Sequence, residues 1–380
     1  MRRFLPYVLK TLTRHRTRTL LTISGSAVAF FVLAFVGAIG EGLEQLGAAG
    51  EADRSLIVFQ ANRFCPFTSI LPEDYGRTIE KLPGVTSVVP MKVYTNNCRA
   101  SLDVVVFHGI PAEKLRTARD LKLIAGDWSS FERQRDAALV GRGVARRRNL
   151  SVGQRFSIGG LTTTIAGIYT ASMPAEEDYI YTHLEFLQRM RSGNQVGKVT
   201  QFEVQLADGA SAEAVAAKID AAFRSGPVAT DTRPKGVFQA DSVADLVELV
   251  GFARWLGYAC VAMVLALVST TTVMSVQDRR SEHAVLQTIG VSSPLVFLLV
   301  IEESTILSLL GAGIGLGVGL ATLAWAGMTM GAEAVTIAFT PSFELALTGL
   351  AAALVVGVLA GIVPGWQAAR ADIVPALRQI

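Results

Sequence analysis

The sequence predicts an α-helical membrane protein with four transmembrane helices and a two-lobed α+β extracytoplasmic domain inserted between the first helix and the second. The 380 residues are 51% hydrophobic and 18% charged, with a mean hydropathy of +0.41. This is too apolar for a soluble protein and too charged for one that lies wholly in the membrane. The apolar residues form four runs, each long enough to span a bilayer, which takes about 20 helical residues at ~1.5 Å rise. The runs are Leu20 to Gly40, Trp255 to Val276, Pro294 to Ala324 and Leu345 to Val363.

These runs set the expected segments of the chain. The expected transmembrane helices occupy residues 20–40, 251–276, 294–324 and 345–365. The other segments are a cytoplasmic start (1–19), the extracytoplasmic domain (41–250, with a β-rich insertion at about 102–197), a cytoplasmic coupling helix (277–293), an outer loop (325–344) and a cytoplasmic tail (366–380).

The amino end has a second interpretation as a cleaved signal peptide, because six Lys or Arg residues precede the first apolar run. That run exceeds a signal core of about 7 to 15 residues, and no Ala-x-Ala pattern follows Gly40. We therefore expect it to stay as a membrane helix. The same basic residues, together with Arg279, Arg280 and Arg370, predict that both termini are cytoplasmic, since positive flanks stay inside.

Two similar halves are expected within the outer domain. In the first, strands at Ser55–Gln60 and Val85–Tyr94 flank a helix at Glu73–Leu82. In the second, a strand at Phe202–Leu206 precedes a helix at Ser211–Phe223 that Ser211 can cap. Further strands are predicted at Val237–Ala240 and, in the insertion, at Val104–Phe107, Ala137–Val140, Arg155–Ile158, Thr162–Ile168 and Tyr179–Tyr181.

No catalytic or metal-binding motif appears in the sequence. His108 and His183 are isolated, and the run Arg146 to Arg148 is best explained as a solvated helix face. The chain has no GxxxxGK[ST] sequence to cradle nucleotide phosphates, and its net charge of +3 does not imply nucleic acid. We expect no cofactor in this chain, so any ATP and Mg would be bound by a partner.

Three cysteines are present. Cys260 falls in the second span as a packing residue, whereas Cys65 and Cys98 both lie outside. An oxidising compartment would permit a disulfide between Cys65 and Cys98, and two unpaired buried thiols are an equal alternative.

Small residues recur at every fourth position in the third and fourth spans. Such stripes let helices approach closely, within one chain or between two subunits. Packing within the chain is expected for at least one stripe, and we favour a dimer of permeases. The residues are Gly311, Gly315, Gly319, Gly357 and Gly361.

Glu302 and Glu303 are expected about eight residues inside the third span, where a charged carboxylate is costly. One of them should face the bundle, and Thr270, Thr271 and Thr272 are the candidate polar neighbours. A structural and a working glutamate are equally compatible with this position.

The segment between the second and third spans predicts a short amphipathic helix. Val285, Leu286 and Ile289 recur at helical spacing, and Gly290 ends the helix. It would dock into a groove of a partner protein or lie on lipid headgroups.

The segment RRSEHAVLQTIG, followed by Glu303 and a glycine-rich stretch, resembles the coupling-helix region of FtsX-like ABC transporter permeases of the MacB/FtsX type. The resemblance implies that Arg280, Glu282, Val285, Leu286, Ile289 and Gly290 contact an ATPase, and that Glu303 is the family's acid in the next helix. The ending VPGWQAARADIVPALR is similar to the family's closing motif, although Ile373 and then Pro375 stand where the family often has an earlier proline. In the outer domain, LPGVTSVVP, LIAGDW, GRGVARRRNLSVGQRFSIGG and TIAGIY resemble the MacB-like periplasmic core domain.

This resemblance implies a non-catalytic permease subunit in a bacterial inner membrane, in which a separate ATPase dimer drives the outer domain by mechanotransmission. Its implied partners are that ATPase, a second permease copy or paralogue, the lipid bilayer, and a periplasmic adaptor with an outer-membrane channel. Export or extraction of a substrate is the leading hypothesis. The alternatives are an FtsX-like relay to a cell-wall hydrolase and a membrane-anchored binding protein or enzyme without an ATPase, which would leave the coupling segment unexplained.

Overall fold

A computed structural model describes residues 14, 16–52, 54–63, 68–96, 104–190, 195–326, 328–332, 335–339 and 341–370. The chain divides into two compact units. We call residues 1–40, 249–325 and 340–380 the helical unit, and residues 41–248 with 326–339 the outer domain, and each is described by itself.

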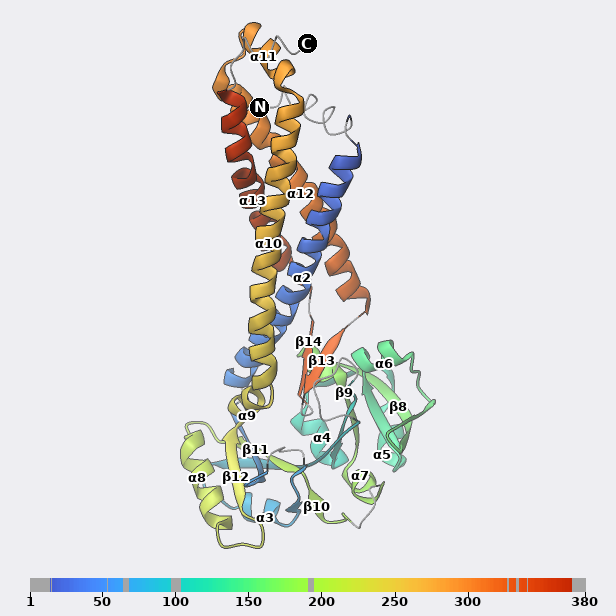
Figure 1. Ribbon diagram of the computed structural model, residues 1–380. Coiled ribbons are helices and arrows are strands. Elements are labelled where there is room, and N and C mark those ends of the chain that lie inside the picture. Colours follow the sequence, from blue (N-terminus) through green and yellow to red (C-terminus); the bar gives the residue numbers. More distant parts are fainter. Residues whose placement is uncertain are drawn as a thin grey trace. The chain divides into compact units, whose positions relative to one another are not determined.

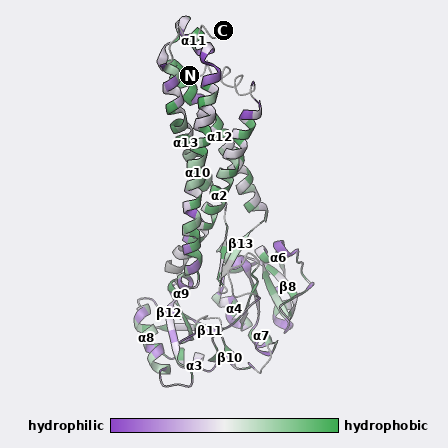
Figure 2. Ribbon diagram, in the orientation of Figure 1, coloured by the Kyte–Doolittle hydropathy of each residue, from purple (hydrophilic) through white to green (hydrophobic). Residues whose placement is uncertain are grey.

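Four helices of the described chain are long and apolar enough to cross a membrane. They are α2 (Arg16–Ala52), α10 (Ala244–Asp278), α12 (Ser293–Ala326) and α13 (Phe343–Ala369). Figure 2 shows them hydrophobic along most of their length. A helix suits this apolar sequence because it satisfies every backbone hydrogen bond within the segment, which lipid cannot do. The predicted fold class is confirmed, and all four helices extend beyond the predicted spans.

The four helices pack around a shared core. Phe30 and Ala34 of α2 meet Val264 and Val268 of α10, together with Ala312 and Leu316 of α12 and Ala353 and Ala360 of α13. Small side chains at many of these positions let the helix axes come close.

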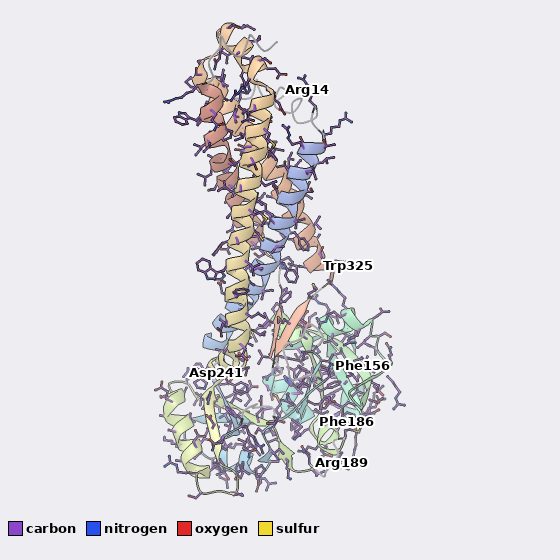
Figure 3. All side chains as sticks on the ribbon, viewed as in Figure 1. Arg14, Phe156, Phe186, Arg189, Asp241 and Trp325 are labelled. Atoms are coloured by element: carbon purple, nitrogen blue, oxygen red, sulfur yellow. The ribbon has the colours of Figure 1, made fainter. Side chains whose placement is uncertain are left out.

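Exposed aromatic residues lie on three of these helices. Trp255 and Tyr258 are exposed in the first half of α10, and Trp325 projects at the end of α12 (Figure 3). At the opposite end of α13, the Arg370 guanidinium lies 4.4 Å from the centre of the Trp366 ring. Tryptophan and tyrosine favour the headgroup region, so these positions are typical of the two bilayer interfaces.

The outer domain is built on one ten-stranded mixed sheet. Its first lobe has four antiparallel strands in the order β12 (Thr230–Pro234), β1 (Ser55–Gln60), β11 (Gln201–Leu206) and β3 (Val85–Thr95). The second lobe continues with β4 (Val106–Ile110), β9 (Tyr179–His183), β6 (Ala137–Gly141), β8 (Leu161–Ala171) and β5 (Leu121–Gly126), and β7 (Arg155–Ile158) pairs with β8. The strands β2 (Leu71–Pro72) and β10 (Lys198–Val199) form a separate pair.

The strand β3 joins the two lobes. Its residues up to Met91 pair with β11, and Lys92 to Thr95 pair with β4. The predicted β-rich insertion is therefore a lobe of the same sheet, connected through one long strand.

Helices cover both lobes. The first lobe carries α3 (Tyr75–Ile79), α8 (Ala212–Phe223) and α9 (Lys235–Ser242). The second carries α4 (Ala112–Ala118), α5 (Trp128–Arg133), α6 (Arg142–Arg148), the 3-10 helix η2 (Pro174–Asp178) and α7 (Leu184–Met190). As predicted, Ser211 caps α8, since its hydroxyl oxygen accepts a hydrogen bond from the Ala214 N–H at 3.4 Å.

Two sequence predictions for this domain are wrong. Val237–Ala240, predicted as a strand, lies in α9, and the edge strand is instead the preceding polar segment β12. Asp220 of α8 explains that strand, because its carboxylate accepts hydrogen bonds from the hydroxyls of Thr230 and Thr232 at 2.8 and 2.7 Å. The helix predicted at Glu73–Leu82 forms only over Tyr75–Ile79.

The expected outer loop between α12 and α13 contains a β-hairpin, β13 (Thr329–Ala332) and β14 (Val335–Ala338). Val335 and Ile337 are buried in the same hydrophobic core as Val106 and Tyr181, and the Thr336 hydroxyl donates to the Ala175 carbonyl at 3.0 Å. This loop is therefore a folded part of the outer domain (Figure 1).

Candidate functional site

A network of charged side chains holds the segment that joins α10 to α12. This segment contains α11 (Arg280–Thr288), and Arg279 lies directly before it. The Arg279 guanidinium, only 7% exposed, donates to Glu282 at 2.9 Å and to Glu303 at 3.3 Å. The other Glu303 carboxylate oxygen accepts from the Ser275 hydroxyl at 3.0 Å. Glu303 thereby links α10, the α11 segment and α12.

Arg14, just before α2, and Arg18 in its first turn extend this network at its exposed edge. Arg14 contacts Glu282 at 2.6 Å, and Arg18 contacts Asp278 at 2.7 Å. Burial alone would raise the pKa of Glu282, but hydrogen bonds and the charges of Arg279 and Arg14 lower it. Glu282 is therefore a stable anion, and exposed pairs of this kind contribute at most about 1 kcal/mol each.

One edge of α11 is apolar and exposed, whereas the opposite side is anchored. Val285 is 39% exposed and Ile289 76%, whereas His283 and Ala284 are buried. Burial, and then the charge of Arg279, lowers the pKa of His283 to about 4, so its ring is neutral at pH 7. An anchored helix with exposed apolar side chains is suited to docking.

Gly290 ends α11 with a left-handed backbone, φ 100°. Its N–H donates to Gln287 and the Val291 N–H donates to Leu286, at 3.1 and 3.0 Å. A glycine is favoured here because a side chain would strain this conformation.

The structure separates the predicted residues into two groups. Glu282 and Glu303 share Arg279, whereas Arg280, Val285 and Ile289 are exposed and Leu286 is half-buried. Glu302 is half-buried and has no ion-pair partner among the described residues. The threonines expected beside the glutamates donate instead to carbonyls of α10, as Thr272 does to Val268 at 2.7 Å. Sequence reasoning missed Arg279, although it lies three residues before Glu282.

Both glycine stripes are used within the chain. A Cβ on Gly315 would collide with the backbone of Ala27 in α2, and one on Gly361 would lie 2.9 Å from the Ile301 Cα in α12. Gly311 and Gly319 likewise face α2, and Gly357 faces Thr305 of α12. The stripes thus pack α12 against α2 and α13 against α12. These contacts within the chain give no support to the predicted dimer, which stays a prediction.

We expect Gly315→Ala to lower the free energy of unfolding by about 2 kcal/mol, because an added methyl overpacks a helix contact made by backbone atoms. Gly313→Ala is the matched control, since its Cβ would meet no described atom within 4 Å. Thermal unfolding in mild detergent measures both. Equal midpoints for the two variants would contradict this packing.

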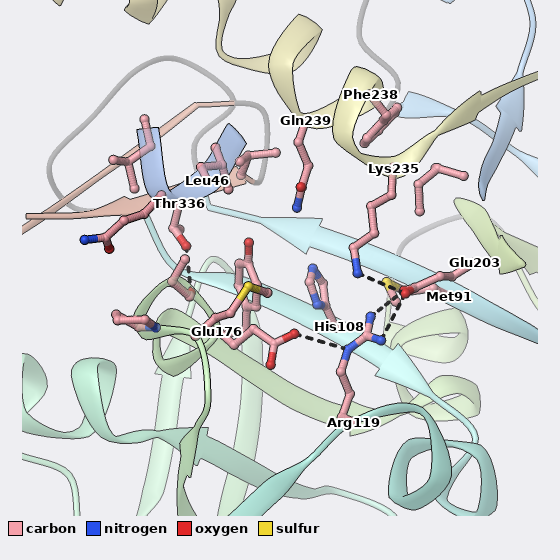
Figure 4. Close-up of a pocket in the computed structure, with 18 of the residues that line it drawn as sticks. Leu46, Met91, His108, Arg119, Glu176, Glu203, Lys235, Phe238, Gln239 and Thr336 are labelled. Atoms are coloured by element: carbon pink, nitrogen blue, oxygen red, sulfur yellow. Dashed lines mark hydrogen bonds and ion pairs between the residues drawn. The ribbon is translucent and has the colours of Figure 1, made fainter. Parts of the chain in front are cut away.

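A second cluster of buried charges lies in the outer domain (Figure 4). Arg119 forms a bidentate pair with Glu203, donates to the Tyr181 hydroxyl at 3.3 Å and lies 3.7 Å from Glu176. Lys235 reaches the same Glu203 at 3.0 Å. Because β11 and α9 supply Glu203 and Lys235 while the second lobe supplies Arg119 and Glu176, the cluster ties the two lobes together.

The electrostatics of this cluster follow from burial and charge. Burial alone would raise the pKa of Glu203, but Arg119 and then Lys235 hold that pKa well below its usual range. Sequence analysis missed the cluster. The signal was present in QFEVQL, where a glutamate stands among apolar residues of a buried strand.

His108 makes the stability of the outer domain depend on pH. Burial, followed by the charge of Arg119, lowers the pKa of its ring to about 3. A depressed folded pKa means that stability is complete above the unfolded value near 6.5 and is lost as the pH falls toward 3. We expect wild type to lose about 3 kcal/mol from this residue between pH 7 and pH 4. His108→Phe should remove this contribution to the pH dependence of the free energy of unfolding. Thermal unfolding of both proteins at pH 7 and pH 4 measures it. A pH profile identical to wild type would contradict it.

Other site predictions are placed as follows. Cys65 and Cys98 lie outside the described residues, and Cys260 is a free, half-buried cysteine in α10. Within the described ranges, no group of three His, Cys, Asp or Glu side chains could hold a metal ion.

The fold and the anchored segment define a membrane-spanning protein with an α+β extracytoplasmic domain between its first and second helices. The family model for the MacB-like periplasmic core domain matches residues 19–222, and that for the FtsX-like permease C-terminal region matches residues 256–373. The chain belongs to the family of MacB/FtsX-like ABC transporter permeases.

Individual relatives are distant. An uncharacterized ABC transporter permease of Methanocaldococcus jannaschii is 23% identical over 98% of this chain and 96% of its own length. The macrolide export ATP-binding/permease protein MacB of Burkholderia cenocepacia is 24% identical over 96% of this chain, which spans 56% of that relative. The periplasmic region of MacB from Actinobacillus actinomycetemcomitans aligns with a TM-score of 0.37 and 13% identity, covering 51% of this chain and 92% of that structure.

Proposed function

We propose that this chain is the permease subunit of an ABC transporter and that α11 is the element on which a separate ATPase acts. Family membership supports the assignment to a transporter. The observation that carries the role of α11 is its two-sided construction. Its apolar edge at Val285 and Ile289 is exposed, whereas Arg279 fastens its base to Glu303 of α12.

Such an element transmits force. Separating the buried Arg279–Glu303 pair is costly. A partner that binds the apolar edge and moves α11 would therefore also move α10 and α12. ATP and Mg would be bound by the partner, since the 380 residues contain no P-loop sequence. The work would then be done on the outer domain, for export or extraction of a substrate outside the membrane.

We also propose that both termini and α11 lie in the cytoplasm of a bacterial inner membrane. The basic residues around Arg14, Arg18, Arg279 and Arg280 support this orientation through the positive-inside rule. A transporter of this kind would use two permease chains around an ATPase dimer, with an adaptor and an outer-membrane channel as further partners.

Ile289→Glu tests the docking edge. The side chain is 76% exposed, so the fold should survive, whereas an interface that buries the isoleucine loses about 1.5–3 kcal/mol of apolar contact, or at least tenfold in affinity. Gln277→Glu is the control, because it places the same charge on an exposed residue outside α11. Co-purification and ATPase turnover are measured with each ABC ATPase of the host, co-expressed with the full chain. Unchanged association and turnover for Ile289→Glu would remove α11 from the coupling role.

A further inference from the structure

One face of α13 is exposed and apolar. Between Glu344 and Arg370 this helix has no charged residue. Its exposed side chains recur three or four residues apart from Leu347 to Trp366, so they lie on one side of the helix. The opposite side is buried, because glycines such as Gly361 pack it against α12. The exposed side is therefore the part of α13 that lipid can contact.

The length of this apolar face places Arg370 relative to a bilayer. Leu347 and Trp366 lie about 29 Å apart along the helix at ~1.5 Å per residue, close to the ~30 Å thickness of a hydrocarbon core. Arg370 follows one turn later, about 6 Å beyond Trp366. The headgroup layer on each side of a bilayer is roughly 5–7 Å thick. With the apolar face in the hydrocarbon core, Arg370 therefore lies at the level of the lipid phosphates.

Arg370 is held against an aromatic ring at this depth. The central carbon of its guanidinium lies 4.4 Å from the centre of the Trp366 ring, and Trp366 is 54% exposed. The negative face of the ring attracts the cation and restrains it beside the helix. Stacking uses the flat face of the guanidinium and leaves the N–H groups at its edge, where they match a phosphate in a bidentate arrangement.

The charge at this site favours an anionic lipid. Arg370 is exposed, and within the described part of the chain no carboxylate pairs with it. The phosphate of phosphatidylcholine is accompanied by a cationic group of the same headgroup, whereas the phosphate of phosphatidylglycerol has none. One arginine near the membrane surface strengthens the binding of anionic lipid by about fivefold.

We propose that Trp366 and Arg370 form a binding site for an anionic phospholipid, whose phosphate accepts hydrogen bonds from Arg370 and whose acyl chain lies along the exposed face of α13. This site goes beyond the proposed coupling function and requires no ATPase.

Fluorescence quenching tests the proposal on the full chain in nanodiscs. Replacing the other three tryptophans with phenylalanine (Trp128→Phe, Trp255→Phe, Trp325→Phe) leaves Trp366 as the single reporter. Its quenching by brominated phosphatidylglycerol and by brominated phosphatidylcholine gives the relative affinity of the two lipids. We expect phosphatidylglycerol to be preferred about fivefold. Equal quenching by the two lipids would overturn the proposal, and so would an absence of quenching by both, which would show that protein covers this face.

Two variants separate the site from the general positive charge at this end of the helical unit. Arg370→Gln should abolish the preference for phosphatidylglycerol, whereas Arg280→Gln removes another exposed cation, outside α13, and should preserve it. Equal losses for the two variants would show a diffuse surface attraction and overturn the site.

Native mass spectrometry repeats the comparison on chains that keep all four tryptophans, so that the result does not depend on the single-tryptophan chain. The wild-type chain should retain more phosphatidylglycerol than phosphatidylcholine from an equal mixture, and Arg370→Gln should retain the two equally. Equal retention by the wild-type chain would contradict the proposal.

Discussion

Replacing Glu203 with leucine is expected to lower the free energy of unfolding of the outer domain by about 3–5 kcal/mol, because two cations are left buried without their shared anion. Arg119 and Lys235 are only 9% and 12% exposed, so water cannot replace the carboxylate. Thermal unfolding of the full chain, followed by near-UV circular dichroism, measures the loss.

Two further variants make this prediction sharp. Lys235→Met leaves the bidentate Arg119–Glu203 pair intact and should cost much less. The quadruple variant Arg119→Met, Glu176→Gln, Glu203→Leu, Lys235→Met removes all four charges and should recover most of the loss, since apolar side chains often replace a buried ion cluster at no cost. A quadruple variant less stable than Glu203→Leu would show that the cluster has a net favourable energy beyond its pairing.

Replacing Glu303 with glutamine is expected to cost about 3 kcal/mol and to abolish stimulation of the ATPase, because the buried Arg279 loses the anion that fixes it to α12. Glu302→Gln is the matched control, since the adjacent side chain has no ion-pair partner among the described residues. The first measurement is the unfolding midpoint in detergent, and the second is ATPase turnover with the co-expressed partner. Equal effects of the two substitutions would contradict the role of the Arg279–Glu303 pair.

The double variant Arg279→Gln, Glu303→Gln separates stability from coupling. It leaves no unpaired charge, so the midpoint should return toward wild type. If α11 must be fastened to α12 for force to pass, turnover should remain unstimulated.

Features that depend on long, local patterns could be predicted from the sequence. The four apolar runs specify the helices, because 20 consecutive apolar residues have few other stable structures in lipid. The continuous apolar run in Ser55–Gln60 and the Ser211 cap likewise act over a few residues. The amphipathic α11 and its terminal Gly290 were also predictable for this reason.

Features that depend on contacts between distant residues could not. The edge strand β12 has the polar sequence TDTRP and is fixed by Asp220 and by pairing with β1. Arg119 and Glu203 are 84 residues apart, so no local pattern predicts their pairing. The helical pattern alone does not decide which of Glu302 and Glu303 faces the bundle. That choice depends on the position of Arg279, which the turn between α10 and α11 determines.

The hairpin β13–β14 changes how the outer domain is attached. The polypeptide passes between the domain and the helical unit four times, at the ends of α2, α10, α12 and α13, rather than twice as a simple insertion would. Each additional covalent connection reduces the conformational freedom of an attached chain segment. Cleavage of the chain within 328–339, with both fragments retained, should therefore reduce the number of covalent connections to the outer domain and leave all four membrane helices intact.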